Sequence, residues 1–114
     1  MLNNKRRFLR YNINFSISSN QIDGKGINIS QDGFGFITDD ELIPAENVPF
    51  QAKLNGFIFN KKKYLIEGRG RLLFSIFFKS YNSYYNGFQF IKLNNDSKII
   101  FNQLIEKIKD SINK

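Results

Sequence analysis

Apolar and polar residues alternate near the start of the chain in the pattern of a half-buried β-strand. Tyr11, Ile13, Phe15 and Ile17 share one face of an extended chain, and asparagine and serine residues occupy the positions between them. The pattern predicts a strand over about 9–18.

Turn-forming residues separate this strand from two more. The stretches SSNQ and DGKG follow it, and Ile27 and Ile29 then indicate a short second strand. An Asp-Gly pair tolerates the positive φ that tight hairpin turns require. Asp32 and Gly33 therefore predict a turn into a third strand that contains Phe36.

The middle of the chain combines one irregular segment with three further extended ones. Residues 38–49 (TDDELIPAENVP) are acidic and include both prolines, so they are predicted to form a connecting loop. The pattern that follows predicts strands over 50–60, 64–78 and 84–93, with the basic turn KKK between the first two.

The period of the apolar residues changes near the C-terminus. Residues with helical spacing are Ile100, Leu104, Ile105, Ile108 and Ile112. They predict an amphipathic helix over 96–112, with Asp96 or Ser97 accepting hydrogen bonds from the free amides of its first turn. Six strands and this helix predict a mainly β fold: a six-stranded antiparallel β-barrel with a C-terminal α-helix, as one domain over 1–114.

The composition excludes several kinds of chemistry. The chain has no cysteine and no histidine, which removes thiolate nucleophiles, disulfides, histidine acid–base catalysis and Cys/His zinc sites. Asp39, Asp40 and Glu41 are consecutive carboxylates in a polar loop, and such runs are usually solvated charge rather than a cation site. We therefore expect no enzymatic activity, no catalytic residues, no metal and no cofactor.

The net charge points to an anionic partner. Seventeen Lys and Arg against ten Asp and Glu give +7, an excess that attracts nucleic acid, phosphorylated small molecules or acidic surfaces. The longest nearly apolar run, LLFSIFF, is too short to cross a bilayer. We expect no membrane insertion and a cytoplasmic location.

Two clusters of polar residues could bind an anion. Arg6, Arg7 and Arg10 lie at the start of the first strand, and a guanidinium offers a planar fork of donors to a phosphate or a guanine edge. On charge alone, a solvated basic tail is the more common explanation. The second cluster, NISQDG at 28–33, is by itself typical of a hairpin turn.

Together the two clusters resemble the paired signature of the PilZ domain. The order is Arg6-x-x-x-Arg10 and then Asn28-x-Ser30-x-x-Gly33. The segments EGRGRLLF (67–74) and NGFQFIKL (86–93) are also similar to strands of that family. PilZ domains are six-stranded barrels with a C-terminal helix, and they are bacterial receptors for the second messenger cyclic di-GMP.

The resemblance implies a role for each matching residue. Arg6 and Arg10 would grip the phosphates and guanine faces of cyclic di-GMP, and Arg7 would assist them. Asn28 and Ser30 would contact guanine edges and sugar-phosphate. Asn28 stands where the family more often has aspartate, a change that replaces a carboxylate by an amide that also donates.

Two further residues take their roles from the same resemblance. Gly33 would hold the turn open for close approach of the ligand. Lys5 precedes the first arginine, where a basic residue accompanies two bound nucleotides rather than one in the family.

The mechanism expected from this assignment is a ligand-ordered switch. Residues 1–10 are polar and charged, so we expect a flexible arginine-bearing arm that folds across the barrel when its arginines bind phosphate. The new surface would then engage an effector protein that the sequence does not identify.

Two alternatives stay open. One is a PilZ-like adaptor that acts without nucleotide. The other is a basic barrel that binds single-stranded nucleic acid, with tyrosine and phenylalanine as stacking platforms. Most phenylalanines occupy alternating strand positions that predict a core, which argues against nucleic acid, and KSYNSYYNG is the one aromatic cluster expected to be exposed.

Overall fold

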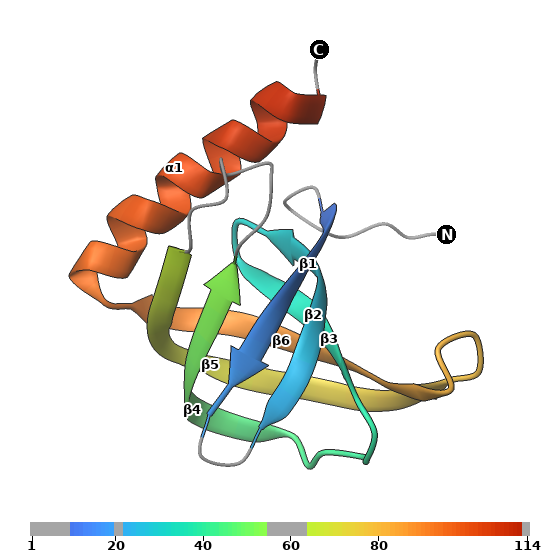
Figure 1. The fold of residues 1–114 in the computed structure, drawn as a ribbon. Helices are drawn as coiled ribbons and strands as arrows, with labels where there is room; N and C mark the ends of the chain where they lie inside the picture. The colour runs from blue at the N-terminus through green and yellow to red at the C-terminus, as the bar shows by residue number, and fades with distance from the viewer. Residues whose placement is uncertain (1–9, 20–21, 55–63, 113–114) are drawn as a thin grey trace, which may run out of the picture.

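The computed structural model describes residues 10–19, 22–54 and 64–112, which form six strands and one helix. Their bounds are β1 Tyr11–Ser18, β2 Asp23–Ser30, β3 Gly33–Thr38, β4 Ala45–Leu54, β5 Tyr64–Phe78, β6 Ser83–Leu93 and α1 Asn95–Ile112. The strands close into a barrel in the order β1-β2-β3-β6-β5-β4, and every neighbouring pair is antiparallel (Figure 1). The predicted mainly β barrel with a C-terminal helix is confirmed.

Phenylalanine rings fill the barrel interior because the alternating pattern turns one face of each strand inward. Phe34 is fully buried at the centre of this cluster. Its ring centroid lies 4.9–5.8 Å from five others, those of Phe15, Phe36, Phe50, Phe88 and Phe90. Aromatic pairs at these separations add to the free energy gained from burial alone.

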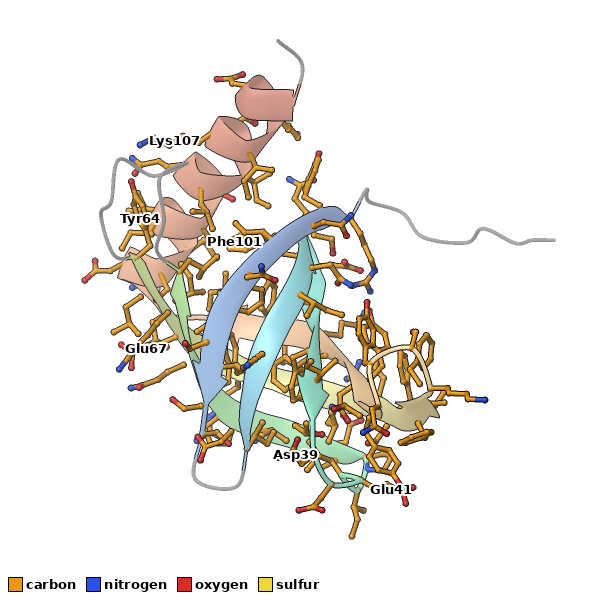
Figure 2. The ribbon with its side chains drawn as sticks, turned by 45° about the vertical axis from the view of Figure 1, so that its right-hand side comes forward. Asp39, Glu41, Tyr64, Glu67, Phe101 and Lys107 are labelled. Carbon is orange, nitrogen blue, oxygen red and sulfur yellow. The ribbon has the colours of Figure 1, made fainter. Side chains whose placement is uncertain are left out.

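The helix packs its apolar face against the barrel where β4 ends and β5 begins (Figure 1). Phe101, Leu104, Ile105 and Ile108 are buried, as the helical spacing predicts. Figure 2 shows Phe101 between helix and barrel, and its ring meets that of Phe90 edge-on at 5.2 Å. No described helix has the length and apolar character needed to cross a membrane.

The first turn of the helix makes different hydrogen bonds from those predicted. α1 begins at Asn95, and the Asn94 carbonyl accepts a hydrogen bond from the Lys98 amide at 2.8 Å. Ser97 belongs to the first turn of α1, and its hydroxyl accepts a hydrogen bond from the Glu67 amide of β5 at 2.8 Å. Asp96 or Ser97 was expected to cap the helix, but the Ser97 hydroxyl instead joins the helix to the barrel, a long-range contact that local sequence does not encode.

Replacing Ser97 by alanine should lower the free energy of unfolding by about 1–2 kcal/mol, because the Glu67 amide loses its acceptor at a largely buried position. Urea denaturation measures this change. Ser80→Ala, at an exposed position on the β5–β6 turn, is the matched control and should change stability by less than about 0.5 kcal/mol. Equal stabilities of the two variants would contradict the assigned role of Ser97.

The acidic segment predicted as a loop over 38–49 is partly strand. β4 begins at Ala45 and includes Pro49, which pairs with Arg69 of β5. A register shift between Ala45 and Val48, with Asn47 at φ 56°, bulges the strand. Since β1 pairs with β4 only from Gln51 onward, the missing proline donor lies where β4 has one neighbour.

The strand predicted over 50–60 is confirmed as far as Leu54, and the rest of it lies outside the described residues. The basic turn KKK falls in the same undescribed segment.

The far ends of β5 and β6 extend past the barrel on the side away from α1 (Figure 1). This hairpin, called the β5–β6 arm below, comprises 74–83, since β5 pairs with β4 only as far as Leu72 and β6 pairs with β3 from Tyr84 onward. Its exposed large hydrophobic side chains are Ile76, Phe77, Phe78 and Tyr81. The expectation that the aromatic residues of KSYNSYYNG (79–87) are exposed holds for Tyr81, whereas Tyr84 and Tyr85 are half-buried.

Candidate functional site

The fold brings together two of the described residues from the paired motif. Arg10 immediately precedes β1, and Asn28 lies on the neighbouring strand β2, where it pairs with Asn12. The Arg10 Nη1 donates a hydrogen bond to Asn28 Oδ1 at 2.9 Å. The partly buried Arg10 uses one of its five donors in this contact, and its Nε has no partner among the described residues.

Asn28 is also bound from its other side by Tyr85, a residue of the KSYNSYYNG segment that was expected to be exposed and had no predicted role at this site. Its Nδ2 donates to the hydroxyl of Tyr85 on β6 at 3.0 Å. Gly35 of β3 lies between these two strands, and a Cβ there would stand 2.2 Å from the Tyr85 hydroxyl and 2.8 Å from Asn28 Oδ1. Only glycine at this position therefore leaves room for the Asn28–Tyr85 contact.

The hairpin turn between β2 and β3 is one residue earlier than predicted. Ser30 pairs with Gly33, so the turn residues are Gln31 and Asp32 rather than Asp32 and Gly33. Gly33 lies within β3 and does not have positive φ. Glycine is required there for another reason: a Cβ would lie 2.0 Å from the carbonyl oxygen of Phe88 on β6.

Ser30 is buried, and its hydroxyl stabilises this turn. It donates to Asp32 Oδ1 at 2.6 Å, and the Gly33 carbonyl lies farther away at 3.4 Å. The Asp32 carbonyl in turn accepts from the Phe90 amide of β6 at 2.8 Å. In this structure Ser30 and Gly33 shape the backbone beside Asn28, and a direct ligand contact by Ser30 stays a prediction.

The other predicted ligand-binding residues, Lys5, Arg6 and Arg7, lie outside the described residues. Their roles stay predictions that follow from the motif.

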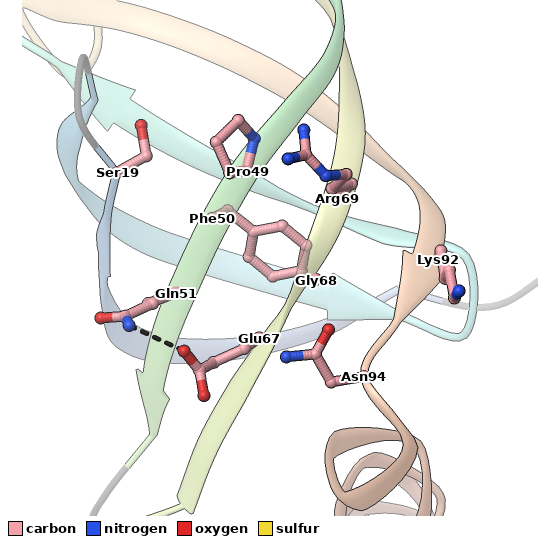
Figure 3. A pocket seen from close by; sticks show the side chains of 9 residues that line it. All are labelled: Ser19, Pro49, Phe50, Gln51, Glu67, Gly68, Arg69, Lys92 and Asn94. Atoms are coloured by element: carbon pink, nitrogen blue, oxygen red, sulfur yellow. Dashed lines mark hydrogen bonds between the residues drawn. The ribbon is translucent and has the colours of Figure 1, made fainter.

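Two other polar regions are separate from this site. Asp39 and Glu41 are exposed at the end of the barrel remote from α1 (Figure 2), and the described part of the chain contains no group of three side chains suited to hold a metal ion. A pocket of about 400 Å³ lies between β4, β5 and the end of β6, where Gln51 donates to Glu67 at 2.8 Å (Figure 3). Neither Arg10 nor Asn28 lines that pocket.

The comparisons with known proteins differ in what they find. No family model and no curated protein matches the chain. Among solved structures, the chain is similar to the Bacillus subtilis inhibitor of motility MotI/DgrA, with a TM-score of 0.69 at 14% sequence identity. The fold is PilZ-like. The match covers 97% of this chain and 53% of that one, so the chain spans about half of the inhibitor and shares its fold over that part.

Proposed function

We propose that this protein is a bacterial second-messenger receptor that binds cyclic di-GMP and relays the signal to an effector protein without catalysing a reaction. The observation that carries the proposal is the 2.9 Å contact between Arg10 and Asn28, since it joins the two halves of the motif at one surface site. The PilZ-like fold gives independent support, because it is the fold that the motif implies.

The chemistry of the site suits this ligand. Cyclic di-GMP presents two phosphate charges and two guanines. Arg10 retains donors for a phosphate beyond the one that it gives to Asn28. Asn28 offers an acceptor to the N–H groups of a guanine edge, and the turn held by Ser30 and Gly33 places backbone beside it.

The arginines ahead of the barrel complete the proposed site. Arg6 supplies the second guanidinium fork and Arg7 assists, while Lys5 favours two bound nucleotides. Cyclic di-GMP thereby orders residues 1–10 across the barrel and changes a protein-interaction surface. The likeness to an inhibitor of motility supports a regulatory role, and we place the protein in the cytoplasm, where its nucleotide ligand is made.

A thermal-shift panel tests the proposal against its alternatives. Saturating cyclic di-GMP should raise the melting temperature by at least several degrees, because a ligand at 100 times its Kd adds about 2.7 kcal/mol to the stability of a small domain. Cyclic di-AMP, GTP and a random single-stranded oligonucleotide should have little effect. No shift with any compound would favour the nucleotide-independent adaptor, and a shift with the oligonucleotide alone would favour the nucleic-acid-binding barrel.

A further inference from the structure

Tyr85 belongs to neither motif, yet it contacts the centre of the candidate site. Three partly buried side chains, from the residue before β1, from β2 and from β6, form a chain of hydrogen bonds: Arg10 to Asn28 at 2.9 Å, and Asn28 to Tyr85 at 3.0 Å. Asn28 is the middle member. Its carbonyl oxygen faces Arg10 and its amide nitrogen faces Tyr85, and it is the guanidinium that determines which atom lies on which side.

The chemistry of the partners determines the orientation of the Asn28 amide. A guanidinium only donates, so the atom that faces Arg10 must be the carbonyl oxygen Oδ1. The amide nitrogen then faces the Tyr85 hydroxyl, whose lone pairs accept its hydrogen. Oδ1 has two lone pairs, and among the described residues only Arg10 donates to it, so we assign the second lone pair to a ligand donor.

The Tyr85 ring is held in place by its surroundings. It packs against Phe74 and Phe78 of β5, with ring centroids 5.9 Å and 5.4 Å away. The hydroxyl sits over Gly35, the one residue type that leaves it space. A hydroxyl fixed in this way is a stationary acceptor for Asn28.

We propose that Tyr85 is a positioning residue that keeps Asn28 Oδ1 directed toward the ligand, and so makes the site selective for guanine. The inference rests on the proposed function. Arg10 keeps its bond to Oδ1 while its other donors bind phosphate, and the Tyr85 hydroxyl, which must then accept, holds the amide nitrogen on the other side. A guanine edge presents N–H donors to the fixed oxygen, whereas adenine presents a ring-nitrogen acceptor at the corresponding position, which an oxygen repels.

An amide needs the Tyr85 hydrogen bond to keep its oxygen toward the ligand, whereas a carboxylate does not. Replacing Asn28 by aspartate therefore tests the proposal. Both oxygens of an aspartate accept, so rotation of the group changes nothing for the ligand. Titration of cyclic di-GMP should show that Tyr85→Phe weakens binding about threefold to tenfold, the factor that one neutral hydrogen bond represents. In the Asn28→Asp background the same change should cost less than about twofold. Cyclic di-AMP should bind Tyr85→Phe no more weakly than it binds the parent.

Tyr84→Phe is the matched control, since it removes the same atom from the adjacent β6 residue, whose ring packs against Phe77 instead. It should leave the affinity unchanged. An equal loss from Tyr85→Phe in both backgrounds would show a general structural role and overturn the proposal, as would no loss in the parent.

The ligand-free protein provides a second readout that separates this inference from the proposed function. Exchange of the Asn28 side-chain amide protons, followed by NMR, should be faster in Tyr85→Phe than in the parent and unchanged in Tyr84→Phe. Unchanged exchange in Tyr85→Phe would overturn the positioning role directly. Slow exchange in a parent that binds no cyclic di-GMP would keep the contact but overturn the proposed function and the ligand-reading role together.

Discussion

Replacing Arg10 by alanine is expected to weaken cyclic di-GMP binding by at least about 100-fold. A hydrogen bond to a charged group contributes about 1.5–3 kcal/mol, and a guanidinium that grips a phosphate with two donors loses both at once. The protein should still fold, because the Arg10 side chain is only partly buried and its partner Asn28 keeps the bond to Tyr85. Calorimetric titration measures the affinity, and a melting curve checks the fold.

Arg69→Ala is the matched control for this experiment. Arg69 carries the same charge and is exposed on β5, where it donates to the Asn47 carbonyl and not to the candidate site. Its removal should change the affinity by less than about threefold, the size of a screened long-range charge effect. Equal losses from the two variants would mean that net charge, rather than the Arg10–Asn28 site, attracts the nucleotide.

Replacing Phe34 by alanine should destabilise the domain by about 3–5 kcal/mol, the cost usual for a large aromatic residue removed from a core. Phe34 is 0% exposed and its ring packs against five other phenylalanines, so its removal leaves a cavity that the surrounding rings fill only in part. Small domains have about 5–15 kcal/mol of stability in total, so the variant should melt far below the parent.

Phe77→Ala provides the comparison, because Phe77 is 51% exposed on the β5–β6 arm. Its replacement should cost less than about 1 kcal/mol by urea denaturation. If the two phenylalanine variants were equally stable, Phe34 would not be the centre of the core.

The barrel could be predicted from the sequence because each strand repeats the same local rule. In an extended chain, alternate residues such as Phe15 and Ile17 lie on the same face, so their apolar side chains can be buried together. The start of β4 was missed because prolines and acidic residues are typical of loops, whereas Pro49 is accommodated where β4 has a single neighbour. That circumstance depends on how strands pair, which local sequence does not report.

The candidate site was likewise predicted from the sequence only in part. Arg10 and Asn28 were predicted from motif spacing, and the structure places them in contact. Tyr85 and Gly35 were not, since their proximity depends on the registers of β2 with β3 and of β3 with β6. The one available signal was a second glycine two residues after Gly33, in a strand that otherwise carries large side chains.

Isothermal titration of the protein with cyclic di-GMP tests the central claim most directly. GTP and cyclic di-AMP are the controls, and two temperatures are needed because the binding enthalpy can pass through zero at one of them. The account predicts micromolar or tighter binding of cyclic di-GMP alone, with the stoichiometry distinguishing one bound nucleotide from two. No binding heat at either temperature, or equal binding of cyclic di-AMP, would contradict it.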